Sequence, residues 1–224
     1  MKFITVLLAD DHEVVRQGFR SLLRMEKDIS VIGEAQTGRI AVEMTKELRP
    51  DVVVMDIAMP LLNGMEAARQ ILAAGATSHV LILSAYSSDD YVDRVVKAGG
   101  RGYLLKQSSA KLLAAAIREL AQGRPFFDPA LSQRFIGAAS AAKVNGKLPP
   151  KEKVLSAREG EILQLIAEGA ANKQIASILN LSIKTVEKHR QRLMDKVGIH
   201  NTAGLTRYAL ANGVIEDGVQ VKRL

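Results

Sequence analysis

Short apolar runs in the first half of the chain each end at polar residues. Two aspartates follow Thr5 to Ala9, a third follows Val52 to Met55, and later runs end at a serine and a lysine; these polar positions are Asp10, Asp11, Asp56, Ser84 and Lys106. If the runs are parallel strands of one sheet, their ends share its carboxyl edge, where open α/β folds bind ligands. The pattern therefore predicts both a fold and a candidate site.

Apolar residues recur at helical spacing between these runs. We expect strands near residues 3–9, 29–34, 52–56, 79–84 and 102–105, each followed by a helical stretch, the fourth of which is defined by Tyr91, Val92, Val95 and Val96. This repeat predicts an α/β fold with a doubly wound, five-stranded parallel sheet and helices on both faces. In the strand order 2-1-3-4-5, a crevice opens between the strands that end at Asp10-Asp11 and at Asp56.

The second half of the chain has a different character. Residues 123–154 are rich in Pro, Gly and Ala and predict a linker, with room for a short helix after Asp128-Pro129. Residues 155–224 contain four helical stretches and no convincing strand, which predicts a smaller all-α domain. Up to Arg124 there are 16 Lys and Arg against 15 Asp and Glu, whereas the remainder has 15 against 9. A basic second half favours a polyanionic partner such as nucleic acid.

Composition excludes several classes of protein. The 224 residues suffice for two modest domains, and 47% hydrophobic with 25% charged residues is typical of globular chains. No apolar run approaches the roughly 20 residues that span a bilayer, so we expect no membrane partner. The absence of cysteine excludes disulfides and thiolate metal sites. The first residues lack the cleavage site of a secretion signal, so we expect a cytoplasmic location.

The polar strand ends have the chemistry of a magnesium-dependent phosphoryl-transfer site. Carboxylate oxygens are ligands that Mg²⁺ prefers, and Asp10 and Asp11 lie beside the predicted position of Asp56. Asp56 is the candidate nucleophile, because Ser84 and Lys106 could neutralise charge on a transferred phosphoryl group. An aspartate after a strand also occurs as a simple turn or helix-cap residue, and that alternative stays open for each aspartate alone.

The helices of the second half predict a helix-turn-helix. Ser156 and Glu159 have capping-box spacing, and the first helix stops at Gly169. A second helix covers residues 172–179, with Asn172 as its expected cap. Ser182 caps a third helix that ends near Val197, before a glycine.

The third helix has one apolar and one polar side. Its apolar side is expected to pack inward and consists of Val186, Leu193 and Val197, flanked by Ile183 and Met194. The opposite stripe could contact base edges in a major groove and consists of Lys184, Glu187, Lys188, Gln191 and Asp195. Thr185, Arg192 and Lys173 are placed to contact phosphates, and His189, between the two sides, is expected to have a structural or phosphate-binding role. Simple solvation of a polar stripe is the alternative.

Residues 1–122 resemble the receiver domain of two-component response regulators. The matching motifs are Leu8-Ala9-Asp10-Asp11-His12, Met55-Asp56-Ile57-Ala58-Met59-Pro60, Asn63-Gly64, Ser84-Ala85 and Gly102-Tyr103-Leu104-Leu105-Lys106. The resemblance implies that a sensor histidine kinase phosphorylates Asp56, and that Asp10, Asp11, Asp56 and the backbone carbonyl of Ala58 bind Mg²⁺. It also implies that Ser84 and Lys106 move toward the phosphoryl group, and that Tyr103 turns inward as part of the switch.

Residues 155–211 resemble the LuxR-type helix-turn-helix of the NarL/FixJ subfamily. The matching motifs are Leu155-Ser156-x-Arg158-Glu159, Asn172-Lys173-x-Ile175-Ala176, Ser182-x-Lys184-Thr185-Val186-Glu187-Lys188-His189 and Lys196-Val197-Gly198. The resemblance implies that the third helix enters the groove of double-stranded DNA. A fourth helix, over residues 202–211, would pair two copies into a homodimer, and RNA polymerase stays open as a further partner.

We therefore predict a phosphorylation-controlled transcription regulator rather than an enzyme with turnover. Two alternatives remain. An aspartate-nucleophile phosphohydrolase would also use Asp56, Mg²⁺ and Lys106, but Ala58 stands where a second acid/base carboxylate would be needed. A constitutive DNA-binding regulator with a vestigial receiver would bind its operator regardless of the state of Asp56.

Overall fold

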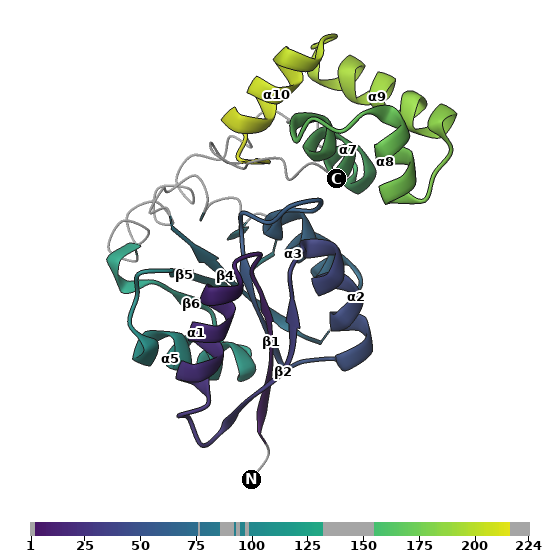
Figure 1. Cartoon of the computed structure of the whole chain (residues 1–224). Coiled ribbons are helices and arrows are strands. Elements are labelled where there is room, and N and C mark those ends of the chain that lie inside the picture. The colour runs from purple at the N-terminus through teal and green to yellow at the C-terminus, as the bar shows by residue number, and fades with distance from the viewer. Residues whose placement is uncertain are drawn as a thin grey trace.

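The computed structural model describes residues 3–75, 77–85, 92, 95–96, 99–131 and 155–215. The described residues form an α/β domain up to residue 131 and a helical domain from residue 155 (Figure 1). The helical domain lies over one edge of the sheet, on the side where α3 begins. No helix in these ranges has the length and apolar character needed to cross a bilayer.

A parallel sheet forms the centre of the first domain. Its strands, in spatial order, are β2 (Ile29–Ala35), β1 (Ile4–Ala9), β3 (Val52–Asp56), β4 (His79–Ser84), β5 (Gly102–Leu105) and β6 (Phe126–Phe127). Strands β3 and β5 are buried along their whole length, as expected where helices cover both faces. The doubly wound order predicted for the first five strands is confirmed.

The predicted number of strands is wrong by one. Strand β6 lies in the segment assigned to the linker, and it pairs with β5 through Gly102 with Phe126 and Tyr103 with Phe127. A two-residue strand is too short to show any hydrophobic periodicity, so the sequence pattern could not reveal it.

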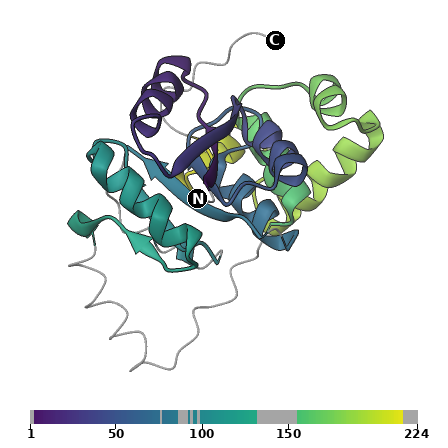
Figure 2. The same ribbon diagram turned by 90° about the horizontal axis from the view of Figure 1, so that it is seen from below.

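Helices cover the two faces of the sheet. Helices α1 (Glu13–Leu23) and α5 (Ala110–Ala121) pack on one face, and α2 (Gly38–Leu48) and α3 (Gly64–Ala73) pack on the other (Figure 2). Each face has its own apolar cluster, one containing residues of α5 and the other residues of α2 and α3. The predicted fourth helical stretch lies largely outside the described residues, although Val92 and Val95 are buried.

The register of the strands brings their carboxyl ends to a common level. Ala9 is opposite Met55, Asp56 is opposite Leu83, and Ser84 is opposite Leu105. The residues that follow β1 and β5 and those that end β3 and β4 therefore meet at one edge. This is the edge predicted from the polar residues.

In the described residues 155–215, four helices pack around one apolar cluster. They are α7 (Ala157–Ala167), α8 (Asn172–Leu179), α9 (Ile183–Val197) and α10 (Thr202–Ala211). The capping box of Ser156 and Glu159 is present, and Ser182 accepts from the Thr185 N–H at the start of α9. Helix α9 ends at Gly198, whose φ of 72° suits a residue without a side chain.

The predicted cap of α8 is wrong. Ala171, not Asn172, is the N-cap, and Asn172 is the first helical residue. The Gln174 side chain accepts from the Ala171 N–H at 2.8 Å, while the Asn172 side chain accepts from Arg190 of α9. Gln174 therefore supplies the reciprocal half of a capping box, whereas Ala171 has no side-chain oxygen for the N–H groups of the first turn.

The predicted linker is described only at its start. The chain becomes helical at Pro129, and the Asp128 carboxylate accepts from the Ala130 N–H, as expected for a helix start. The rest of the predicted short helix lies outside the described residues.

Candidate functional site

Four side chains form an oxygen-rich cluster at the carboxyl edge of the sheet. One ligand atom from each of Asp10, Asp11, His12 and Asp56 lies within 4.8 Å of the others. Asp10 and Asp56 are each only 3% exposed, whereas Asp11 and His12 are exposed. The sequence-predicted carboxylates are therefore brought together, and they are open to solvent on one side.

Lys106 occupies the centre of this cluster. Its Nζ lies 2.8 Å from Asp10 Oδ2 and 2.9 Å from Asp56 Oδ2. Burial by itself would lower the pKa of the Lys106 ammonium, but attraction to Asp56 and hydrogen bonds to Asp10 and Asp56 raise it. Lys106 is therefore a permanent cation at this edge, and it compensates part of the carboxylate charge.

Asp56 has an unusual protonation equilibrium. Burial raises its pKa from 3.8 to about 6, Lys106 opposes the increase, and the charges of Asp10 and Asp11 add to it. Ionisation of Asp56 is therefore unfavourable in the folded protein, and a cation near the cluster would make it more favourable. The donor set of three carboxylates fits a hard divalent cation such as Mg²⁺.

The loop between β3 and α3 approaches Asp56 closely. A Cβ atom on Gly64 would lie 1.9 Å from the carbonyl oxygen of Asp56, so this position requires glycine. The Gly64 N–H donates to the Ile57 carbonyl at 2.9 Å, which closes the loop, and Asn63 caps α3. The loop carries Ala58, whose carbonyl is a metal ligand according to the resemblance to receiver domains.

Ser84 and Tyr103 lie on the neighbouring strands. Ser84 ends β4 with 1% exposure, and its carbonyl accepts from the Lys106 N–H at 2.7 Å. Tyr103 on β5 is fully buried within the cluster beneath α2 and α3. In this structure Tyr103 already has an inward position, and its switching role remains a prediction.

Sequence reasoning missed two residues that support the site. The Arg16 guanidinium is buried and donates to the carbonyl of Asp10 at 2.6 Å. The buried Asp128 carboxylate accepts from Ser108 and from the Leu105 N–H, so it holds the turn on either side of Lys106. The position of Asp128 directly before Pro129 predicted a helix start. Nothing in the sequence indicated that its carboxylate also bonds to Leu105 and Ser108.

The polar side of α9 is exposed, as predicted. Lys184, Glu187, Lys188, Gln191 and Arg192 are exposed, as is Lys173 at the start of α8. Val186 and Leu193 are fully buried on the opposite side, with Val197 and Met194 packed against the same cluster.

Three residues of α9 need separate description. Ile183 was expected to flank the buried side, but it is 46% exposed, because the first residue of the helix projects past the apolar cluster. Thr185 and His189 are partly buried. The Thr185 hydroxyl lies 2.8 Å from that of Ser182, so it also takes part in the helix cap.

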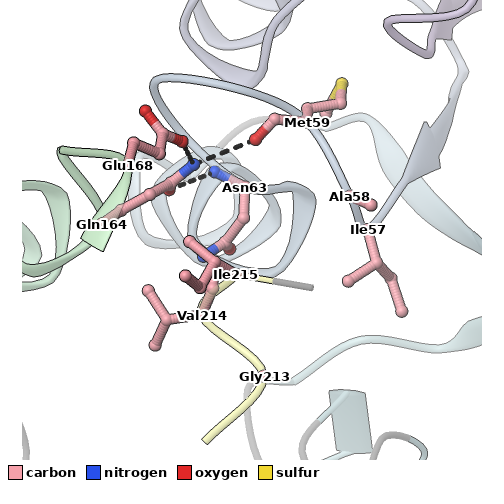
Figure 3. Close-up of a pocket in the computed structure, with 9 residues that line it drawn as sticks. All are labelled: Ile57, Ala58, Met59, Asn63, Gln164, Glu168, Gly213, Val214 and Ile215. Atoms are coloured by element: carbon pink, nitrogen blue, oxygen red, sulfur yellow. Dashed lines mark hydrogen bonds between the residues drawn. The ribbon is translucent and has the colours of Figure 1, made fainter. Parts of the chain in front are cut away.

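The two domains meet at the β3–α3 loop. Figure 3 shows residues of this loop facing Gln164 and Glu168 of α7 and the segment after α10, around a cavity of about 10 Å³. Gln164 hydrogen-bonds to the backbone of Met59 and Asn63. Burial raises the pKa of the Glu168 carboxyl, although Gln164 and Leu61 donate hydrogen bonds to it.

Comparisons with known proteins match both domains. Residues 6–118 match the family described as "Response regulator receiver domain", and residues 153–209 match "Bacterial regulatory proteins, luxR family". The chain is 37% identical over 212 residues to the transcriptional regulatory protein LiaR of Bacillus subtilis, which covers 95% of this chain and 99% of that protein.

Two solved structures extend these similarities. The response regulator ChrA of a heme-sensing two-component system is 35% identical, covers 96% of this chain and 100% of its own, and has a TM-score of 0.51. The two-component response regulator RcsB in complex with DNA is 26% identical, covers 94% of this chain and 99% of its own, and has a TM-score of 0.57.

Proposed function

Because the chain belongs to the two-component response regulators with a LuxR-type DNA-binding domain, we propose that phosphorylation of Asp56 by a sensor histidine kinase controls its dimerisation and its activity in transcription. The single observation that carries the proposal is the position of Asp56. It is a buried carboxylate held 2.9 Å from Lys106, beside Asp10 and Asp11, at the edge of the sheet.

The residues of this edge supply the chemistry of phosphoryl transfer. An Asp56 carboxylate oxygen forms a bond to phosphorus while the bond from phosphorus to the kinase histidine nitrogen breaks and its electron pair returns to the ring. Lys106 and the Ser84 hydroxyl then stabilise the added charge. Asp10, Asp11, Asp56 and the Ala58 carbonyl would hold Mg²⁺, which supplies further neutralisation of phosphoryl charge when bound.

The helical domain is proposed to bind double-stranded DNA through α9. Base edges would face Lys184, Glu187, Lys188 and Gln191, and DNA phosphates would be contacted by Lys173, Thr185, His189 and Arg192. The exposure of all of these residues except the partly buried Thr185 and His189 supports the assignment, as does the similarity to RcsB in complex with DNA.

Dimerisation is proposed to involve α10. Its outer residues Thr202, Ala203 and Arg207 are exposed, so they are available to a second copy. A dimer would match two half-sites about one helical turn apart. Contact with RNA polymerase would follow from binding near a promoter, in the cytoplasm.

The test is treatment of the full chain with acetyl phosphate and Mg²⁺, followed by mass spectrometry and by measurement of self-association and DNA affinity. We expect one stable acyl phosphate per chain on Asp56, stronger self-association and tighter DNA binding, with Asp56→Asn as the unreactive control. Repeated turnover of a soluble phosphate ester, supplied in a separate assay, would instead support a phosphohydrolase. Labelling of Asp56 that changes neither association nor DNA affinity would support a constitutive regulator.

A further inference from the structure

The loop that follows Asp56 packs a partly buried side chain against the helical domain. Leu61 has a φ of 68°, a left-handed conformation that is unfavourable for leucine, and its side chain packs against the apolar cluster of the helical domain. Its N–H donates to the Glu168 carboxylate of α7 at 3.2 Å. Contacts from the other domain therefore stabilise a strained loop conformation.

Gln164 of α7 satisfies two more backbone groups of this loop. Its Oε1 accepts from the Asn63 N–H at 2.7 Å, and its Nε2 donates to the Met59 carbonyl at 2.9 Å (Figure 3). Its Nε2 also donates to Glu168 at 2.7 Å. The side chain is 1% exposed, so each of these bonds is shielded from water.

Asn63 extends the contact to the end of the chain's last described helix. Its side-chain amide donates to the Val214 carbonyl at 3.0 Å, while its oxygen caps α3. The adjacent cavity of about 10 Å³ has room for one water at most. Buried polar groups of the loop therefore depend on α7 and on residues 213–215 for their partners.

The contact leaves the DNA-facing side of α9 uncovered. Lys184, Lys188 and Gln191 are exposed in the same structure in which Gln164 is buried. Docking therefore does not block the proposed DNA contacts directly. Docking acts instead on the β3–α3 loop. In this loop Ala58, whose carbonyl is the proposed Mg²⁺ ligand, directly precedes Met59, whose carbonyl accepts a hydrogen bond from Gln164.

We propose that Gln164 is a positioning residue that holds the β3–α3 loop in a docked arrangement opposed to phosphorylation of Asp56. The inference rests on the proposed function. Movement of Met59 or Asn63 on loading of the site with a cation and a phosphoryl group would break their bonds to Gln164. The helical domain also lies over the edge at which a donor must reach Asp56, which is 3% exposed. Docking of the helical domain therefore disfavours binding of Mg²⁺ and the phosphoryl group at Asp56, and their binding disfavours docking to the same extent.

The experiment compares the full-length wild type with Gln164→Ala. One measurement is the rate of Asp56 acyl phosphate formation with acetyl phosphate and Mg²⁺. The other is hydrogen exchange at the Leu61 and Asn63 amides, with and without beryllium fluoride and Mg²⁺. The second measurement does not depend on phosphorylation. In Gln164→Ala the Leu61 amide is the reporter of docking, because the substitution itself removes the acceptor of the Asn63 N–H.

Loss of the two loop bonds should weaken docking about tenfold. Because only the undocked fraction reacts readily, phosphorylation should be faster by about three- to tenfold. Exchange at both amides should already be fast in Gln164→Ala, whereas the wild type should become fast only after beryllium fluoride and Mg²⁺ are added. Glu168→Ala, which removes the acceptor of the Leu61 N–H, should act in the same direction.

Gln70→Ala is the matched control, since Gln70 donates to Glu161 across the same interface at 2.9 Å from α3 rather than from the loop. We expect it to change the phosphorylation rate less than about twofold. An unchanged rate in Gln164→Ala and Glu168→Ala, or equal effects of Gln164→Ala and Gln70→Ala, would overturn the inference. Absence of Asp56 labelling in every variant would overturn the proposed function instead.

Discussion

Neutralising Asp56 should stabilise the metal-free protein. Burial raises the pKa of Asp56 from 3.8 to about 6, which corresponds to roughly 3 kcal/mol of disfavoured ionisation in the folded state. Between these two pH values the unfolded chain releases a proton that the folded chain retains, so wild-type stability falls as the pH rises. At pH 7.5 in EDTA, Asp56→Asn should therefore unfold about 10 °C above the wild type.

Thermal unfolding by circular dichroism at several pH values tests this expectation. The advantage of Asp56→Asn should be small at pH 4, where the folded wild type is protonated and the unfolded chain, with an Asp56 pKa of 3.8, is close to half protonated. Added Mg²⁺ should stabilise the wild type but not the variant. Asp28→Asn is the control, because a hydrogen bond from Arg118 lowers the pKa of Asp28 and its removal should give no gain. Equal stability of wild type and Asp56→Asn at pH 7.5 would refute the assigned electrostatics.

Four further substitutions have definite expected outcomes. Gly64→Ala places a Cβ atom 1.9 Å from the carbonyl of Asp56 and should cost about 2 kcal/mol or more in urea unfolding; normal stability would mean that the loop relaxes freely. Glu159→Ala removes the reciprocal half of the α7 cap and a bond from a lysine of α9, and should lower the melting temperature of the helical domain by several degrees. Lys188→Ala should change sequence preference in DNA-binding titrations, whereas Lys173→Ala should weaken all sequences and flatten the salt dependence; identical behaviour would contradict the groove assignment.

The α/β domain could be predicted from sequence because its signals are local. Each of the first five strands is a short apolar run, and four of them end at a site residue or directly before one, as β3 ends at Asp56 and β5 ends before Lys106. Parallel pairing then carries these ends to one edge without further information. The α9 stripe was equally accessible, because helical periodicity alone separates Val186 from Lys188.

The parts that could not be predicted depend on partners distant in the chain. Strand β6 exists only because β5 offers it an edge, and Asp128 acts on the turn around Lys106 from 23 residues beyond Leu105. Tyr103 could be placed on a strand but not assigned a fully buried position. In each case the local residues are compatible with several structures, and tertiary contact selects one.

The polar stripe of α7 shows most clearly why a sequence pattern can mislead. Glu161, Gln164 and Glu168 recur at i, i+3 and i+7, a spacing that normally marks a solvated helix face. Here Glu161 and Gln164 are 6% and 1% exposed, because the receiver domain covers them. An apolar stripe would be costly to expose, whereas these side chains exchange protein partners for water at little net cost. Because these residues are polar, their pattern did not predict an interface. The same polarity permits α7 to be stable both when docked on the receiver domain and when released from it, as a reversible switch requires.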